Sequence, residues 1–156
     1  MRAISLWQPW ASLIPFGLKK YETRSWATNY RGDLLICSAK KQSREQERIY
    51  DKILYKYQDQ YPDLLIDDES VREWNDLPRG CVIAIVTLAD CIQMTEESIT
   101  QHPEVEIDCG DWQVGRWAWK LENIRKIKEP FPVKGRQGFF SVDVDLTVEV
   151  LEAVNV

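Results

Sequence analysis

Residues 4–32 read ISLWQPWASLIPFGLKKYETRSWATNYRG, and this stretch decides how the chain is interpreted. It contains three tryptophans, two prolines and a closely spaced group of charged residues (Lys19, Lys20, Glu22 and Arg24). A hydrophobic core requires apolar bulk alone, whereas aromatic rings beside paired charges are typical of a site for a flat, polar, anionic ligand. The stretch therefore predicts a binding site as well as a folded unit.

The same stretch predicts a strand, a short helix and two further strands. Residues 2–7, 20–26 and 32–39 are the predicted strands. Pro9 suits the first turn of a helix because its missing N–H costs nothing there. Gly17 suits the C-terminal cap of that helix.

The rest of the chain predicts one long helix, three strands and several breaks. The helix is expected over residues 43–60 with an S-x-x-Q cap at Ser43, and the strands over residues 81–91, 115–127 and 139–150. Residues 61–76 are expected to contain one short helix that ends at Trp74. Residues 94–111 are expected to form an acidic loop with a helical turn from Thr95. Pro130-Phe-Pro is expected to break the regular structure, and residues 133–138 to form a basic loop. Five or six strands of mixed order with two to four helices predict an α+β fold, a small mixed β-barrel.

The overall composition predicts a soluble globular protein without a membrane span. Hydrophobic residues make up 44% of the chain and charged residues 29%. The longest apolar run, Cys81–Ala89, is too short to cross a bilayer. No secretory cleavage site follows Met1, so a cytoplasmic location is expected.

The cysteines and the single histidine do not predict a metal site. Cys37, Cys81, Cys91 and Cys109 form no C-x-x-C pair. The first three are interpreted as small buried hydrophobic residues on strands. His102 is expected to be solvated in the acidic loop.

Charge is distributed unevenly along the chain. Residues 1–50 hold nine Lys and Arg against four Asp and Glu, a net of +5, and residues 112–138 hold seven against two, again +5. Residues 51–111 hold four against fifteen, a net of −11, and residues 139–156 hold none against four. If the two basic segments fold together, they form a positive face for an anionic partner. The alternative, that the charges only keep separate faces soluble, stays open.

Lys19, Glu22 and Arg24 form the first candidate site. On a strand that begins at Lys20, Glu22 and Arg24 project from one face, and Lys19 in the preceding turn can lean over them. A carboxylate between two cations stays ionised and accepts hydrogen bonds, for example from a base edge, while the cations hold a phosphate or carboxylate. The alternative is a solvated strand face that contributes little energy.

Aromatic residues and a basic loop extend this candidate site. Trp7, Trp10 and Trp26 are predicted to stack on a base or ring, although Trp10 better suits a core position and Trp26 suits core and surface equally. A loop with two glycines carries Lys134 and Arg136, where the backbone can approach a phosphate closely.

Serine, cysteine and histidine form no pattern typical of nucleophilic catalysis. If the protein is an enzyme, Lys19 is the candidate base because burial lowers a lysine pKa. Glu22, or Asp90 at the end of the strand from residue 81, is the candidate carboxylate partner.

Three motifs in order near the N-terminus resemble one family. They are SLWQPWASLI, then G-x-K-x-x-E-x-R-S-W, and then YRG-x-LLI; the second motif consists of Gly17, Lys19, Glu22, Arg24, Ser25 and Trp26. Together they resemble the ASCH (activating signal cointegrator homology) domain of the PUA-like superfamily. The resemblance implies one domain over 1–156, with insertions at about 42–76 and 92–114, and a cleft lined by the second motif.

The resemblance also implies a function. The family is generally regarded as binding RNA, so single-stranded nucleic acid or a modified nucleoside is the expected partner, and no cofactor or metal is expected. The residues expected to bind the ligand are Trp7, Trp10, Lys19, Glu22, Arg24, Ser25, Trp26, Lys134 and Arg136. Some bacterial relatives hydrolyse acetylated cytidine with a lysine, a threonine and a glutamate. Here Lys19 takes the lysine position but Glu22 takes the threonine position, which departs from that pattern unless Thr23 substitutes.

Two functions from different classes therefore remain, with RNA binding favoured. The alternative is a small amidohydrolase acting on an acetylated or otherwise modified nucleoside, with Lys19 as base. A protein-interaction role for the acidic middle segment is a third hypothesis.

Overall fold

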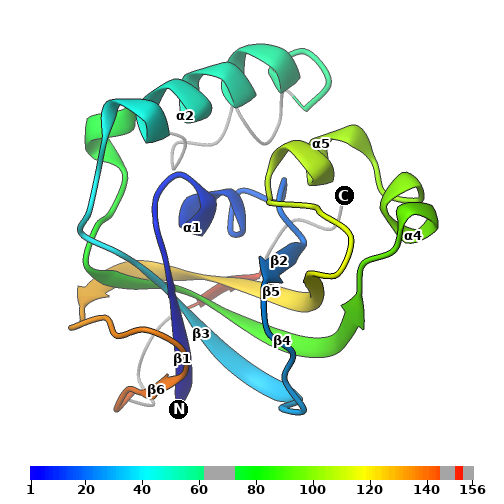
Figure 1. Ribbon diagram of the computed structural model, residues 1–156. Helices are drawn as coiled ribbons and strands as arrows, with labels where there is room; N and C mark the ends of the chain where they lie inside the picture. The colour runs from blue at the N-terminus through cyan, green and yellow to red at the C-terminus, as the bar shows by residue number, and fades with distance from the viewer. Residues whose placement is uncertain (62–72, 145–149, 153–156) are drawn as a thin grey trace.

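The computed structural model describes residues 1–61, 73–144 and 150–152 (Figure 1). The strands are β1 (Arg2–Leu6), β2 (Tyr21–Arg24), β3 (Gly32–Ser38), β4 (Cys81–Gln93), β5 (Trp117–Pro132), β6 (Phe140–Ser141) and β7 (Val150–Glu152). The helices are α1 (Trp10–Leu13), α2 (Arg44–Tyr57), α4 (Glu96–Thr100) and α5 (Glu104–Asp108), with the 3-10 helix η1 (Trp74–Asp76). None of the described helices is long and apolar enough to span a membrane.

The described strands form one mixed sheet. Its order is β2-β5-β4-β3-β1-β6, and β7 also pairs with β5. β1 and β3 run parallel, with Ile4 opposite Ile36, and the other pairs are antiparallel. In the described part of the chain no pairing joins β2 to β6, so the sheet is not closed into a barrel.

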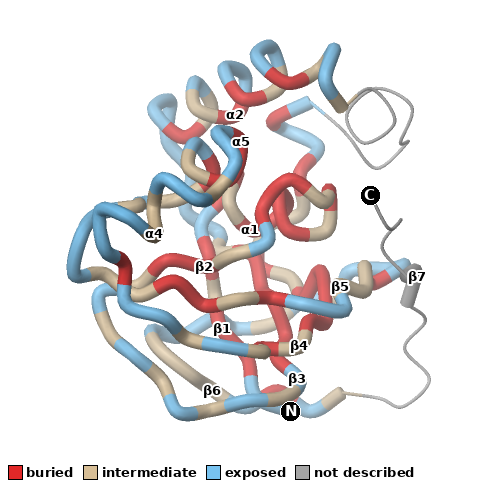
Figure 2. The backbone as a smooth tube through the Cα atoms, turned by 90° about the vertical axis from the view of Figure 1, so that its right-hand side faces the viewer, coloured by how far each residue is buried: buried red, intermediate tan, exposed pale blue. Residues whose placement is uncertain are grey.

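Both faces of the sheet carry apolar side chains because the strands alternate their residues. On one face Ile4 and Ile36 join a cluster that includes Ala11 of α1 and Trp119 of β5. On the other face Ala3 and similar small or branched residues form a second cluster. Figure 2 shows the buried segments running through the middle of the sheet and through α1.

A third cluster lies above α1. It joins Leu13 and Phe16 to Tyr50 and Ile53 of α2 and to Val105 of α5. α1 therefore lies between α2 and the sheet, as both views show (Figures 1 and 2). Ser43 caps α2, because its side chain accepts a hydrogen bond from the backbone N–H of Gln46.

The α+β class and the mixed strand order match the sequence-based predictions, and the four α-helices of the described residues fall within the two to four that were predicted. The N-terminal strands, α2 with its Ser43 cap and β4 lie within or close to their predicted ranges. Cys37 is buried on β3, whereas Cys81 and Cys91 on β4 are half-buried, and all the cysteines are free. Most of the segment expected to end in a helix at Trp74 lies outside the described residues, and η1 begins at Trp74.

Two predictions about the C-terminal third were wrong. The breaker expected at Pro130-Phe-Pro lies inside β5, where Phe131 pairs with Val82 and Pro132 with Cys81. In the described residues that end of β5 has β4 on one side only, and proline is tolerated on such an edge. The single strand expected over 139–150 is replaced by β6, which pairs with β1, and β7, which pairs with β5.

The acidic segment before β5 is more ordered than a loop. The predicted turn from Thr95 is α4, which has a capping box between Thr95 and Ser98. The second helix, α5, was not predicted, because five residues are too few to show a helical period. His102 is half-buried instead of fully solvated: its ring centroid lies 4.8 Å from that of Tyr21 and 4.6 Å from that of Trp112.

Candidate functional site

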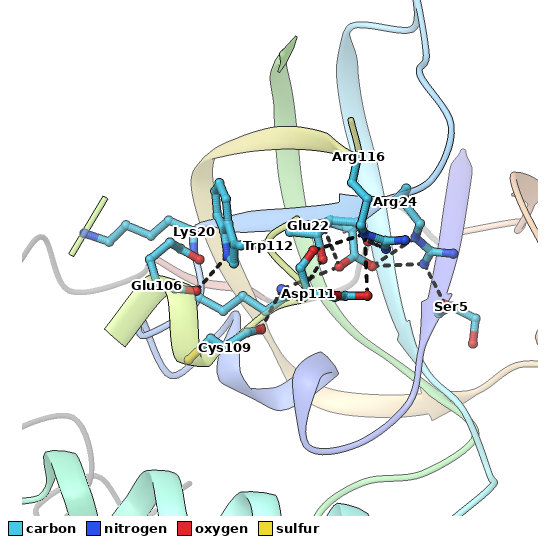
Figure 3. Close-up of polar contacts among 11 residues, drawn as sticks. Ser5, Lys20, Glu22, Arg24, Glu106, Cys109, Asp111, Trp112 and Arg116 are labelled. Carbon is cyan, nitrogen blue, oxygen red and sulfur yellow. Dashed lines mark hydrogen bonds and ion pairs between the residues drawn. The ribbon is translucent and has the colours of Figure 1, made fainter. Parts of the chain in front are cut away.

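Lys19 and Arg24 converge on the carboxylate of Glu22 on β2. Figure 3 shows the contacts between Glu22 and Arg24. The Lys19 side chain is 1% exposed, and its Nζ lies 3.5 Å from Oε1 of Glu22. The Arg24 guanidinium lies on the other side of the carboxylate, with Nε donating to Oε2 at 3.1 Å. These three residues, called the buried cluster below, hold one carboxylate between two cations.

The buried cluster is fixed by the backbone around it. Lys19 Nζ donates to the carbonyl oxygen of Cys109 at 2.8 Å, and Arg24 donates to the carbonyl oxygen of Ser5 at 3.1 Å. The backbone N–H of Thr23 donates to Oε1 of Glu22 at 2.9 Å. Both carboxylate oxygens of Glu22 are therefore already engaged by protein donors.

The segment that follows α5 closes over the buried cluster. A Cβ on Gly110 would lie 3.0 Å from Nε1 of Trp112 and 3.3 Å from Nζ of Lys19, so a glycine permits this close approach. Arg116 then ties the segment to β2, since it donates to the carbonyl oxygens of Asp111 at 3.0 Å and Thr23 at 3.3 Å.

A cavity of about 580 Å³ opens next to the buried cluster. Its lining is Ser5, Leu6, Trp7, Trp10, Lys19, Glu22, Thr23, Arg24, Ile49, Lys52, Ile53, Lys56, Asp108, Gly110, Asp111 and Arg116. The lining combines two tryptophans and three aliphatic side chains with five cations and three carboxylates. It therefore offers both apolar surface and a net positive charge to a ligand.

Helix α2 forms one wall of this cavity and is tied to α5. Lys56 Nζ lies 2.6 Å from Oε1 of Glu104 and 2.7 Å from Oδ2 of Asp108. The hydroxyl of Tyr57 also donates to Asp108. Burial raises the pKa of Asp108, but the hydrogen bonds from Lys56 and Tyr57 outweigh it, so that pKa lies below its usual value.

A groove of about 1210 Å³ adjoins the cavity. The two share Ser5, Trp7 and Arg24 in their linings. The basic loop contributes Lys134 and Arg136 to the groove, so residues from both basic segments of the sequence line it.

The predicted tryptophans take different positions. Trp7 is 47% exposed and lines both the cavity and the groove. Trp10 is half-buried, lines the cavity and packs against two core clusters. Trp26 lines the groove, yet its ring also meets Trp119 edge-on at a centroid distance of 4.8 Å.

Two predicted site residues lie apart from these linings. Ser25 is exposed and belongs to neither the cavity nor the groove. Asp90 is exposed on β4, where Arg31 lies 3.6 Å from its Oδ1, and it also belongs to neither lining. The geometry therefore does not bring Asp90 to Lys19 as a carboxylate partner.

A different carboxylate lies behind Lys19. Glu106 is 3% exposed, and its Oε1 accepts from the backbone N–H of Lys20 at 2.8 Å (Figure 3). Burial raises the pKa of Glu106, opposed by the charge of Lys19. Among the described residues no group of His, Cys, Asp and Glu could hold a metal ion.

Sequence reasoning missed several residues that line the cavity. Gly110 and Asp111 end the acidic segment and Arg116 directly precedes β5, whereas Lys52 and Lys56 come from the C-terminal half of α2. Because residues 51–111 carry a large excess of acidic residues, Lys52 and Lys56 were not considered as ligand-binding cations. The spacing of Lys52 and Lys56, four residues apart on a predicted helix, was the one signal that they share a face.

Comparison with known proteins assigns the family. The model of the ASCH domain matches residues 4–131. The chain belongs to the ASCH domain family. Activating signal cointegrator 1 of Homo sapiens and that of Mus musculus are each 29% identical to it over 140 residues. The match covers 90% of this chain but 22% of each of those proteins, so the chain spans about a fifth of their length.

Solved ASCH structures share the fold. The crystal structure of ASCH from Zymomonas mobilis aligns with a TM-score of 0.54 at 14% identity, covering 91% of this chain and 87% of that one. A mutant form of the same Zymomonas mobilis protein aligns with a TM-score of 0.51 at 13% identity, covering 91% and 89%. These structures are consistent with the PUA-like fold expected from the sequence.

Proposed function

We propose that this ASCH domain binds single-stranded RNA, with one nucleotide held in the cavity. The observation that carries the proposal is the buried cluster in the cavity wall, next to the aromatic surface of Trp7 and Trp10. A flat base can lie against the tryptophans, at about 1–3 kcal/mol per stacked base. Family membership supports the same function, since ASCH domains are generally regarded as binding RNA.

The contacts within the buried cluster assign each member a role in this proposal. Arg24 borders both the cavity and the groove, where it can hold a phosphate. Lys19 donates to Cys109 and lies beside Glu22, which leaves a third N–H for an acceptor on the ligand. The sequence favoured a role for Glu22 in accepting a hydrogen bond from a base edge. Because both of its carboxylate oxygens already contact protein donors, Glu22 instead positions the two cations in this proposal.

The test is binding of a fluorescent single-stranded oligonucleotide, RNA in one series and DNA in the other, measured by anisotropy over a range of salt. Affinity for RNA is expected to fall steeply as salt rises, because cations release counterions from the phosphates. Arg24→Ala should weaken RNA binding at least tenfold, whereas the control Arg31→Ala, an exposed arginine outside both linings, should not. Binding that ignores salt, or none at micromolar protein, would overturn the proposal.

A second candidate function is hydrolysis of an acetylated or otherwise modified nucleoside. The observation in its favour is that Thr23 and Lys19 both line the cavity, with the Cγ2 methyl of Thr23 3.1 Å and Nζ of Lys19 3.3 Å from a Cβ placed on Gly110. Against it, the hydrogen bond to Cys109 and the contact with Glu22 suit an ammonium, whereas a base must be neutral. Incubation with N4-acetylcytidine decides the matter: release of acetate that is lost in Lys19→Ala would support it, and turnover unchanged in that variant would exclude Lys19 as the base.

A further inference from the structure

The groove next to the cavity has a one-sided charge. Its cationic lining residues are Arg24, Lys40, Lys41, Lys134 and Arg136, and its other lining residues are uncharged. Within the described part of the chain, no aspartate or glutamate lines it. In a chain with a net charge of −5, this concentration of positive charge is a local feature.

Most of these cations have no acidic partner in the residues that the structure describes. Among the ion pairs of those residues, Arg24 is paired with Glu22, but Lys40, Lys134 and Arg136 belong to none. Lys41 lies with its Nζ 4.5 Å from the centre of the Trp7 ring. Unpaired cations in an open groove repel one another, and an anionic ligand removes that repulsion.

The backbone holds Lys40 and the basic loop in place. Gly80 has a φ of +67°, and a Cβ there would lie 2.8 Å from Cε and 2.9 Å from Cγ of Lys40. The Lys40 side chain therefore lies directly over Gly80, along the groove. Across from it, a Cβ on Gly135 would lie 3.1 Å from Oγ of Ser5, so the basic loop packs closely against β1.

We propose that the groove is a track for the phosphates of the same strand whose nucleotide enters the cavity. The ligand is then an oligonucleotide, because a mononucleotide in the cavity leaves Lys40, Lys134 and Arg136 unused. The strand passes from one site to the other at Trp7 and Arg24, which line both. This inference rests on the proposed function and adds Lys40 and Lys41 to the residues that contact the ligand.

The experiment compares an oligouridylate of about eight nucleotides, within the site sizes of single-strand binding folds, with uridine monophosphate. The full chain and the double variant Lys40→Ala/Lys134→Ala are titrated with each over a range of salt. Both lysines are exposed, so the variant should fold, which thermal unfolding checks. The matched control is Lys128→Ala, an exposed lysine of β5 outside both linings.

The wild-type chain is expected to bind the oligonucleotide at least tenfold more tightly than the mononucleotide. The double variant should weaken oligonucleotide binding about tenfold. It should also reduce the magnitude of the slope of log affinity against log salt concentration by about 1.4, which is about 0.7 for each lost phosphate contact. A double variant that matches Lys128→Ala in affinity and salt slope would overturn the phosphate track. So would a mononucleotide that binds as tightly as the oligonucleotide.

The same titrations separate this inference from the proposed function. If the oligonucleotide binds and Arg24→Ala weakens it while the double variant does not, the phosphate track alone is wrong. If the wild-type chain binds no oligonucleotide, both proposals are wrong.

Discussion

The cavity and the groove are both positively charged, but they hold their cations in different ways. In the cavity, Lys19 and Arg24 are bound to Glu22 and to backbone carbonyls, and Lys56 is bound to Asp108. In the groove, Lys134 and its basic neighbours project without acidic partners among the described residues. A donor already held by protein partners favours one ligand geometry, whereas an exposed cation without an acidic partner attracts any phosphate. We therefore expect the cavity to supply selectivity and the groove to supply salt-dependent affinity.

The largest effect that separates the two regions should come from Glu22→Ala. Removing this carboxylate takes away the acidic group that lies 3.5 Å from Nζ of Lys19, whose side chain is 1% exposed. Loss of one partner of a buried ion pair typically costs about 3–5 kcal/mol. Chemical denaturation should show a loss of that size in the free energy of unfolding, together with loss of ligand binding.

Two variants serve as controls for that prediction. Glu22→Gln keeps the shape of the side chain and should cost less stability than Glu22→Ala. Lys134→Ala, in the exposed groove, should change the free energy of unfolding by no more than about 0.5 kcal/mol. A Glu22→Ala protein as stable as the wild type would show that the buried cluster does not hold the cavity together.

Trp7→Ala should affect binding strongly and stability little, because Trp7 is 47% exposed at the junction of the two regions. Loss of a stacking surface should weaken oligonucleotide binding by about 2 kcal/mol. Anisotropy measures this change, and Trp7→Phe, which keeps a ring, should recover most of it. Equal affinity in the wild type and Trp7→Ala would mean that no base stacks at the junction.

The two regions also differ in how far the sequence predicted them. The spacing of Lys19, Glu22 and Arg24 placed them together because they lie within six residues on one turn and strand, where geometry is local. The residues that close the cavity, among them Gly110 and Arg116, lie far from β2 along the chain. Their segment has no repeating apolar pattern, so only the tertiary fold brings them to β2.

For the fold itself, the predictions succeeded where one periodic pattern served one element, as in α2 and β4. They were wrong where pairing partners decided the outcome. β5 continues through Pro130 because that end pairs only with β4 among the described residues, and no local rule contains this information. The open sheet, in place of a closed barrel, likewise depends on which strands end up at its edges.

Gly110→Ala should have a smaller effect than Glu22→Ala or Trp7→Ala. It tests how tightly residues pack where the segment after α5 closes the cavity. The added methyl would meet Nε1 of Trp112 at 3.0 Å and Cγ2 of Thr23 at 3.1 Å. Overpacking by one methyl should cost about 1 kcal/mol of unfolding free energy. Gly135→Ala in the groove loop meets only Ser5, at 3.1 Å to its Oγ and 3.5 Å to its Cβ, among the described residues, and should cost less. Equal losses in the two variants would contradict a difference in packing between the regions.

The smallest predicted effect is a change in the free energy of unfolding with pH, and it comes from His102. Burial between Tyr21 and Trp112 lowers the pKa of His102 from its usual value of 6.5. The folded protein thus favours the neutral ring, and the unfolded chain takes up a proton first as the pH falls. His102 therefore contributes stability that is fully present above pH 6.5 and is lost as the pH falls below it.

Unfolding by denaturant at about pH 7.5 and about pH 5.5 should reveal this loss, and His102→Gln should remove it. The chain has no second histidine, so the difference between the two proteins isolates this ring. Glu106 acts in the opposite direction, because burial raises its pKa and stability is lost as the pH rises through that value. The groove lining, as far as the structure describes it, contains neither histidine nor carboxylate, so any pH effect on stability in this range should be unchanged by Lys134→Ala. If His102→Gln keeps the full pH dependence, the ring is not held neutral by its two aromatic neighbours.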